Sequence, residues 1–405
     1  MKATGDQQLV KRINRSVLLR LLRAQPGLSR ARLAQQSGLT KSTVSALVRE
    51  LLDEHWLSEP SAPVASDGMG RPSTPLVLDA DTRLLLGLEI GVRQLRLVTV
   101  SLNGTLLSSL QRPLASTDAR AVCAQAVQLV YQAWQTAQQH GRWLSGIGVC
   151  LPGAVDARSG LVRFAPNLGW RDLGFLAMLT RALAAAAVPD VALHLHNDAD
   201  AAALGEYEFG TKGNTDPLIF VNCDVGVGAG IVLHDRLFTG AHGMAGEVGH
   251  SVLQVDGALC SCGRRGCAET LIGAQALSGL HGIERGAQAL GLLIQNLDAM
   301  FNPTTVVVGG SSCSAYPTLL KRAALVVRGY AQMAGVPPPG IRAARYGLNA
   351  AAVGAAAVAW HRYLRPTHLH AGPAPDAGHA DATRNAPVGA ELAGTETPLE
   401  VEGST

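Results

Sequence analysis

Three cysteines and one histidine lie in a single glycine-rich stretch, and this cluster constrains the fold more than any other feature of the chain. Cys260, Cys262 and Cys267 flank two glycines, and His250 lies ten residues before the first cysteine. Three thiolates and one imidazole complete the tetrahedral coordination of a structural Zn²⁺ ion, and glycine lets the backbone turn tightly between the sulfurs. The stretch predicts a zinc element over residues 250–267; three incidental thiols or one disulfide are the alternatives.

The composition is typical of a globular protein of the cytoplasm. The chain has 405 residues, of which 47% are hydrophobic and 16% charged, so it is long enough for two or three domains. No apolar run approaches the length of a membrane span, and the N-terminus lacks the apolar core of a signal peptide. Seven cysteines, three of them clustered, suit a reducing compartment better than a disulfide framework. We therefore expect a cytoplasmic protein without a membrane span.

The charge is distributed unevenly, although the net formal charge is only +3. Residues 1–60 contain ten Lys and Arg against five Asp and Glu, a difference of +5. Residues 371–405 contain six acidic residues against one Arg, a difference of −5. A basic N-terminal segment suggests a polyanionic partner. The tail over residues 366–405 has almost no large apolar side chains to bury, so we expect it to be disordered.

The N-terminal segment has the periodicity of three short helices. Apolar residues over 13–22 recur at helical spacing, and Ser29 and Thr40 are good N-caps for a second and a third helix. Gly38 allows a tight turn between those two helices, so the segment predicts a helix-turn-helix whose third helix enters the DNA major groove. Small hydroxyl side chains permit close approach to DNA, and an arginine can reach a guanine edge or a phosphate. The candidate DNA-binding residues of the third helix are Lys41, Ser42, Thr43, Ser45 and Arg49.

The segment after these helices favours DNA binding over the alternative, which is an ordinary three-helix bundle with solvated charges. Leu57 and residues 60–78 contain Gly-Met-Gly-Arg-Pro at 68–72, between short extended pieces. This pattern predicts a β-hairpin wing with a basic tip, from which Arg71 would enter the adjacent minor groove. The alternative for Arg71 is a solvated loop arginine.

Strand and helix patterns alternate from residue 84 onward and predict an α/β fold. Residues 84–90 and 95–101 are predicted to pair, with the turn at Asn103-Gly104, and residues 119–139 are predicted to form a helix. Two lobes with a repeated glycine-turn hairpin resemble the actin-like ATPase fold, in which a cleft separates the lobes. The other predicted strands are 145–150, 193–196, 218–223, 230–233 and 305–308.

Several motifs resemble the signature of the ROK family, which contains sugar kinases and sugar-responsive repressors. They are Asp-Val-Gly-Val-Gly-Ala-Gly at 224–230, Gly-Met-Ala-Gly-Glu-Val-Gly-His at 243–250, and the element C-x-C-G-x-x-G-C-x-E that begins at Cys260. The resemblance implies a winged helix-turn-helix (α+β) followed by a two-lobed α/β domain of the actin-like ATPase, or ribonuclease H-like, fold. The family's repressors carry such a head, whereas its kinases lack it. The expected domains are 1–80 (winged helix-turn-helix), 81–365 (ROK sugar-binding domain) and 366–405 (acidic tail).

The same resemblance implies a sugar site. In the family's kinases the Asp of an Asn-Asp pair accepts the proton of a sugar hydroxyl, and Asn197-Asp198 matches that pair. Other matching positions would hold sugar hydroxyls, because carboxylate, amide and imidazole groups supply directional hydrogen bonds. His250 would give one ring nitrogen to zinc and the other to the sugar. Taken singly, each residue has the alternative of a helix cap or a core hydrogen bond. The implied sugar-binding residues are Asn167, Asn197, Asp198, Glu247, His250 and Glu269.

The phosphate side of the implied cleft departs from the family's kinases. Their first turn reads Asp-x-Gly-Gly-Thr and organises phosphate and Mg²⁺, whereas residues 89–93 read Glu-Ile-Gly-Val-Arg. Val92 places a β-branched side chain where backbone should approach phosphate. The chain between Glu269 and Asn302 is also shorter than is usual for the family, in a region that contributes to the nucleotide side and the dimer contact of relatives. We therefore expect no kinase activity and no catalytic residue.

These features together predict a transcriptional regulator of sugar-metabolism genes, with repression as the favoured mode. The expected partners are double-stranded operator DNA, a small sugar effector and further copies of the chain in a homodimer or tetramer. Sugar binding would favour one arrangement of the lobes and change the spacing of two winged heads on DNA. The alternatives are a sugar kinase with an accessory DNA-binding domain and a constitutive DNA-binding dimer that has lost both ligands.

Overall fold

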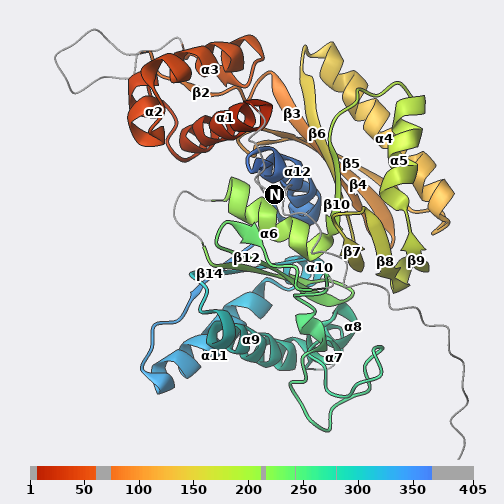
Figure 1. Ribbon diagram of the computed structural model, residues 1–405. Coiled ribbons are helices and arrows are strands. Elements are labelled where there is room, and N and C mark those ends of the chain that lie inside the picture. Colours follow the sequence, from red (N-terminus) through yellow and green to blue (C-terminus); the bar gives the residue numbers. More distant parts are fainter. Residues whose placement is uncertain (1–6, 61–73, 211–215, 242, 280, 367–405) are drawn as a thin grey trace, which may run out of the picture.

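A computed structural model describes residues 7–60, 74–210, 216–241, 243–279 and 281–366 of the chain (Figure 1). A small helical head lies beside two larger α/β lobes, and two helices run between the lobes. The predicted tail lies outside the described residues from residue 367 onward. The head contains α1 (Gln7–Ala24), α2 (Arg30–Ser37), α3 (Lys41–Asp53), β1 (Leu57–Ser58) and β2 (Val77–Leu78).

Capping residues begin the second and third helices of the head, as predicted. The side chain of Ser29 accepts a hydrogen bond from the N–H of Arg32 at the start of α2, and that of Thr40 accepts one from the N–H of Thr43 at the start of α3. Gly38 ends α2 in the left-handed conformation, with a φ of 71°. The predicted helix-turn-helix is therefore confirmed.

The base of the predicted wing is also confirmed. Strands β1 and β2 pair antiparallel, with Leu57 opposite Leu78 and Ser58 opposite Val77. The tip of the wing and Arg71 lie outside the described residues, so the placement of Arg71 in a minor groove stays a prediction.

The first lobe is a five-stranded mixed sheet in the order β10-β6-β3-β4-β5. Buried apolar residues of α4 and α5 form one core with this sheet, and both helices lie on the same side of it (Figure 1). A three-stranded sheet in the order β7-β8-β9 adjoins it. The elements are β3 (Arg83–Ile90), β4 (Gln94–Ser101), β5 (Leu106–Pro113), α4 (Ala119–Gln139), β6 (Trp143–Leu151), β7 (Ala154–Asp156), β8 (Leu161–Ala165), β9 (Trp170–Leu173), α5 (Phe175–Ala185) and β10 (Leu193–Asn197).

One predicted hairpin is wrong in its turn. Strands β3 and β4 do pair antiparallel, but the turn that joins them lies at residues 91–93. Asn103-Gly104 instead joins β4 to β5, and Gly104 has a φ of 83°. The turn signal was genuine, but β5 was not predicted because its residues are partly or fully exposed and lack an apolar pattern.

The second lobe is a five-stranded mixed sheet in the order β13-β12-β11-β14-β15. Helices α9 and α11 share a buried apolar core with this sheet. None of the described helices is both long enough and apolar enough to cross a membrane. The elements are β11 (Leu218–Cys223), β12 (Val227–Leu233), β13 (Arg236–Leu237), α7 (Glu269–Ile272), α8 (Ala274–Leu277), α9 (Gly282–Phe301), β14 (Thr305–Gly309), α10 (Ser311–Ala315), α11 (Pro317–Ala334) and β15 (Gly340–Ala343).

Helices α6 (Asp198–Phe209) and α12 (Ala350–Tyr363) pack against each other between the two sheets (Figure 1). Their backbones approach closely where they cross, since a Cβ atom on Gly205 would lie 2.9 Å from the Cα of Gly354. A Cβ on Gly148 of β6 would overlap the backbone of α12, and a Cβ on Gly230 of β12 would overlap the backbone of α6. The absence of side chains at these glycines lets the pair of helices seat directly on both sheets.

Candidate functional site

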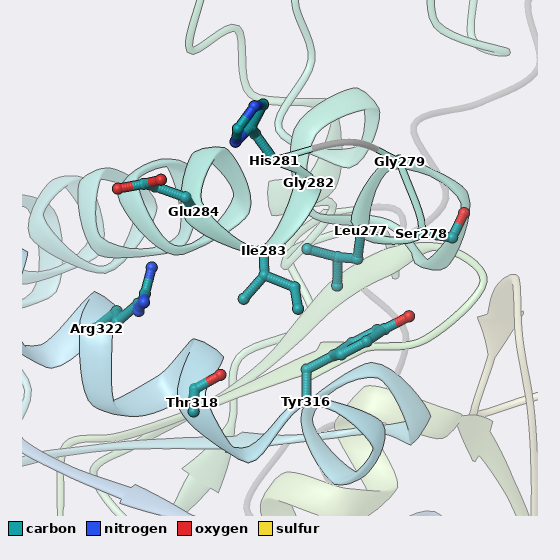
Figure 2. Close-up of a pocket in the computed structure, with 10 residues that line it drawn as sticks. All are labelled: Leu277, Ser278, Gly279, His281, Gly282, Ile283, Glu284, Tyr316, Thr318 and Arg322. Carbon is teal, nitrogen blue, oxygen red and sulfur yellow. The ribbon is translucent and has the colours of Figure 1, made fainter.

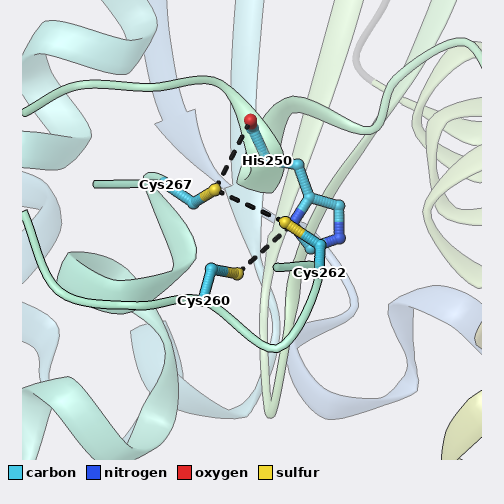
Figure 3. Close-up of side chains that lie close together, drawn as sticks. All are labelled: His250, Cys260, Cys262 and Cys267. Carbon is cyan, nitrogen blue, oxygen red and sulfur yellow. Dashed lines mark hydrogen bonds between the residues drawn. The ribbon is translucent and has the colours of Figure 1, made fainter. Parts of the chain in front are cut away.

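Four side chains come together at the predicted metal element (Figure 3). The ligand atoms of His250, Cys260, Cys262 and Cys267 all lie within 4.8 Å of one another. The sulfurs of Cys262 and Cys267 are 3.7 Å apart, and Nδ1 of His250 is 3.6 Å from the sulfur of Cys260. These four residues could therefore hold a metal ion, with Nδ1 as the histidine ligand atom.

Backbone turns bring the cysteines together. The N–H of Cys260 donates to the carbonyl of Arg264 at 2.8 Å, and the N–H of Gly263 donates to the carbonyl of Cys260 at 2.9 Å. Gly263 and Gly266 have φ values of 86° and 70°, and a Cβ on Gly266 would overlap the carbonyl of Gln254. Gly266 is therefore required for steric reasons, and the positive φ of Gly263 favours glycine, as the sequence pattern predicts.

Asn197 lies where β10 meets α6, and its amide is engaged within the protein. Its Oδ1 caps α6 by accepting hydrogen bonds from the N–H groups of Ala199 and Asp200, at 2.8 and 3.2 Å. Its Nδ2 donates to the carbonyl of Gly153 at 3.0 Å. Asn197 thus fixes the first turn of α6, which carries the next residue of the predicted sugar site.

Asp198 is the first residue of α6 and is only partly shielded from solvent. Its carboxylate accepts hydrogen bonds from the N–H of Ala199 at 2.9 Å and from Nδ2 of Asn222 at 3.3 Å. Burial raises the pKa of Asp198 to about 6, and the charges of Asp224 and Glu247 also raise it. A carboxylate with such a pKa can accept a hydrogen bond or a proton from a hydroxyl group near neutral pH.

Glu247 and Glu269 flank the metal element in the sequence, and the charge of Glu247 acts on Asp198. Burial raises the pKa of Glu247, the charge of His250 lowers it, and the charge of Glu269 raises it. One carboxylate oxygen of Glu269 accepts a hydrogen bond from the N–H of Val227 at 3.2 Å. Glu247 therefore links Asp198 at the start of α6 to His250 and Glu269, because its carboxylate interacts with the charges of all three.

Asn167 lies in the short 3₁₀ helix η1 (Pro166–Leu168) and is exposed. Gly153 connects this region to Asn197: its carbonyl accepts the Asn197 amide, and a Cβ on it would lie 2.9 Å from the Cα of Ala165. Among the described contacts, none joins Asn167 itself to the acidic residues of the site. Its role in sugar binding stays a prediction.

Sequence reasoning missed Arg96, whose partner Glu89 begins the segment that departs from the phosphate motif of the family's kinases. In the antiparallel register of β3 and β4, Arg96 lies opposite Glu89. Its Nη1 donates to Oε2 of Glu89 at 3.0 Å and also to the carbonyl of Leu348. Burial raises the pKa of Glu89 to about 7, against the lowering effect of Arg96. Writing the two predicted strands, 84–90 and 95–101, opposite each other in antiparallel order would have revealed this pair.

One face of α3 is polar and open to solvent, opposite the face that packs in the head. Thr40 caps the helix and also lies 2.9 Å from the hydroxyls of both Ser42 and Thr43. Thr43 is partly buried. The residues on the exposed face include Lys41, Ser42, Ser45 and Arg49. The buried residues are Val44, Leu47, Val48 and Leu51.

A cavity of about 410 Å³ lies in the second lobe, between α8, α9 and the start of α11 (Figure 2). Its polar lining includes His281, Glu284, Tyr316 and Arg322. None of the predicted sugar-binding residues is among its described lining residues. The cavity is therefore separate from the cluster formed by Asp198 and the metal element.

The head and the two lobes define a class of protein in which a DNA-binding unit is joined to an actin-like domain. The ROK family profile matches residues 85–283, and the profile named winged helix-turn-helix DNA-binding matches residues 12–57. The chain therefore contains a ROK family domain, with a winged helix-turn-helix domain in front of it.

Related proteins include both regulators and kinases. The chain is 28% identical over 387 residues to the xylose repressor of Bacillus subtilis (strain 168), covering 89% of this chain and 98% of that protein. It superimposes with a TM-score of 0.72 on a ROK family transcriptional regulator described as a homologue of the E. coli MLC protein, at 24% identity, covering 88% and 97% of the two chains. A ROK hexokinase from Thermus thermophilus has a TM-score of 0.57 at 26% identity, and covers 68% of this chain and 98% of its own. The two regulators match nearly nine-tenths of this chain, whereas the hexokinase matches about two-thirds of it.

Proposed function

We propose that the protein is a transcriptional repressor whose binding to operator DNA responds to a sugar. The main support for this proposal is that one chain combines an exposed polar recognition helix with a ROK domain in which Arg96 pairs with Glu89. The similarity to a xylose repressor over nine-tenths of the chain supports it. D-Xylose is accordingly the first effector to test.

The head, residues 1–80, would bind the operator through α3. Lys41, Ser42, Ser45 and Arg49 lie on the exposed face that would enter the major groove. Thr43 supports that face through its contact with Thr40. Arg71 would add a minor-groove contact from the wing. Two half-sites require two heads, so the active form would be a homodimer or a dimer of dimers.

The effector would bind in the ROK domain, residues 81–365, at the first turn of α6. Asp198, Glu247 and Glu269 would offer carboxylate oxygens to sugar hydroxyls. The second ring nitrogen of His250 points away from the sulfurs (Figure 3) and would be open to the sugar. Asn197 would act by holding the helix start, and Asn167 would complete the site from the first lobe. Carboxylate and imidazole groups at several angles suit the many hydroxyls of a monosaccharide.

The metal would be a structural Zn²⁺ ion. Zinc–sulfur bonds of about 2.3 Å in a tetrahedron place two sulfurs about 3.8 Å apart, and the sulfurs of Cys262 and Cys267 lie 3.7 Å apart. With three cysteines and His250 as ligands, no coordination position is left for a substrate. Zinc would hold the loop that carries Glu247, His250 and Glu269, and thus would stabilise the sugar site.

The test is operator binding with and without sugar. DNA fragments selected by the purified protein from a genomic library would serve as operators, and fluorescence anisotropy would give Kd with D-xylose, other aldoses or amino sugars present. We expect Kd for the operator to change at least about fivefold with one of these sugars, and to rise steeply with salt as phosphate counterions are released. Salt-insensitive binding, or a Kd that no sugar changes, would contradict the proposal.

A sugar kinase with an accessory DNA-binding domain remains the second candidate, because Asp198 belongs to an Asn-Asp pair like that of the family's kinases and has a raised pKa. Incubation with ATP, Mg²⁺ and the same sugars separates the two. We expect no turnover, since Arg96 neutralises Glu89 where Mg²⁺ would be needed. Turnover at about 1 s⁻¹ or faster, an ordinary enzymatic rate, would favour the kinase.

A further inference from the structure

The winged head is anchored to the end of α6 by a buried carboxylate. The side chain of Glu208 is completely buried, near the C-terminal end of α6. It accepts hydrogen bonds from Arg23 of α1, from His361 Nδ1 at 2.7 Å and from Arg365 Nη1 at 2.7 Å. Arg23 also donates to the backbone carbonyl of Glu208 at 3.1 Å. One arginine of the head thus binds both the side chain and the last turn of α6.

A second ion pair joins the same helix of the head to the second lobe. Arg20 of α1 lies 3.1 Å from Asp235, in the turn between β12 and β13. Asp235 is also held by Arg365 and by the hydroxyl of Tyr207, the latter at 2.7 Å. Through α1 the head therefore contacts two neighbouring carboxylates, Glu208 on α6 and Asp235 on the second lobe.

Apolar packing attaches the head to the other interlobe helix. Leu18, Leu19 and Leu22 of α1 are buried in one core cluster with residues of α12. Trp56, just after α3, stacks on Trp360 of α12 with ring centroids 5.9 Å apart. The same cluster also includes Leu85 of β3 and Val98 of β4. Since α12 and α6 touch at glycine backbones, the helix on which the head packs is in direct contact with α6.

The opposite end of α6 is the candidate sugar site. The helix has 12 residues, which corresponds to about 18 Å at 1.5 Å per residue. Asp198 begins the helix, and Glu208 is its second-last residue. A helix of this length moves as a rigid rod, so a shift at its first turn is transmitted to its last.

We propose that the contact of Arg23 with Glu208 is the coupling element through which a sugar at the first turn of α6 changes the position of the winged head. This inference rests on the proposed function of the ROK domain as a sugar sensor. Glu208 has no solvent to replace a lost cation, so separating it from Arg23 is costly, and α1 follows α6 when the helix moves. Sugar occupancy would thereby alter the spacing of two heads on DNA.

The test compares three variants in the full-length protein. Arg23→Ala removes the contact, and Arg23→Lys keeps the charge. Lys11→Ala is the matched control, because Lys11 lies on the same helix but pairs with Glu50 inside the head, at 2.8 Å. The measured quantity is the ratio of operator Kd with and without the sugar that affects the wild type, which cancels any direct effect of the lost charge on DNA affinity. Isothermal titration would show that each variant still binds the sugar.

We expect a ratio of at least about fivefold in the wild type and in Lys11→Ala, and less than about twofold in Arg23→Ala. Arg23→Lys should recover part of the wild-type ratio, which also shows that the position tolerates substitution. An Arg23→Ala protein that binds sugar and keeps the wild-type ratio would overturn the inference and leave the proposed function standing. A wild type whose operator Kd no sugar changes would overturn the proposed function, and the inference with it.

Discussion

Replacing Asp198 by asparagine should stabilise the protein at neutral pH and weaken sugar binding. The folded protein raises the pKa of this carboxyl from 3.8 to about 6, so its ionised form is less favourable in the fold than in the unfolded chain. Because one pKa unit is worth about 1.36 kcal/mol, this difference lowers the free energy of unfolding by about 3 kcal/mol above pH 6. Partial exposure of the side chain makes this an upper limit, and we expect a gain of about 1.5 kcal/mol from Asp198→Asn at pH 7.5.

The sign of the pH dependence follows from the direction of the shift. A carboxyl whose pKa is higher in the folded protein than in the unfolded chain destabilises the fold at high pH, where both states are ionised. The penalty is therefore full above pH 6 and disappears below pH 3.8, where both states are protonated. The gain from Asp198→Asn should therefore fall to about half at pH 5.0. Asp190→Asn, at an exposed position, should leave stability unchanged at both pH values.

Equilibrium urea denaturation at pH 7.5 and pH 5.0 measures the two gains, and isothermal titration measures sugar binding. We expect the sugar Kd of Asp198→Asn to rise at least about tenfold, since a carboxylate acceptor is lost. A variant that is less stable than the wild type at pH 7.5, or whose gain does not shrink on acidification, would refute the account of Asp198 as a strained carboxylate kept for ligand binding.

Three further predictions concern the metal, the recognition helix and the head. Cys262→Ser should lower zinc affinity more than about tenfold and so reduce the zinc content measured by atomic absorption. Cys313→Ser, outside the cluster, should keep its zinc. Equal zinc content in the two variants would contradict the ligand set. Arg49→Ala should weaken operator binding by about 1–3 kcal/mol in anisotropy and Arg32→Ala on α2 by less; the reverse order would reject α3 as the reading helix. Trp360→Ala should destabilise the protein by about 3–5 kcal/mol in urea denaturation, because the ring is fully buried against the head; a change below about 1 kcal/mol would show that the head is docked by other contacts.

The ion pair of Arg96 with Glu89 bears on the choice between the two candidate functions. Under the proposed function, this pair would stand where the family's kinases organise Mg²⁺, and the carboxylates near the first turn of α6 would bind the sugar.

The features that could be predicted from the amino-acid sequence are those that a few neighbouring residues decide. The caps at Ser29 and Thr40 and the cysteine loop with Gly263 and Gly266 depend on backbone turns within some twenty residues, and each has the predicted form. Local sequence is less informative about which strands a turn connects. Asn103-Gly104 was correctly predicted as a turn but assigned to the wrong pair of strands, because β5 is exposed and has no apolar pattern.

The contacts that attach the head to the lobes could be decided only by the tertiary structure. Arg23 and Glu208 are 185 positions apart in the chain, and nothing in the residues around either one indicates the other. They meet because α6 and α12 cross through glycines and because buried leucines of α1 pack on α12. Local sequence determines which helices and turns form, whereas the burial of apolar faces against distant elements determines which charged groups must find each other to remain paired inside the fold.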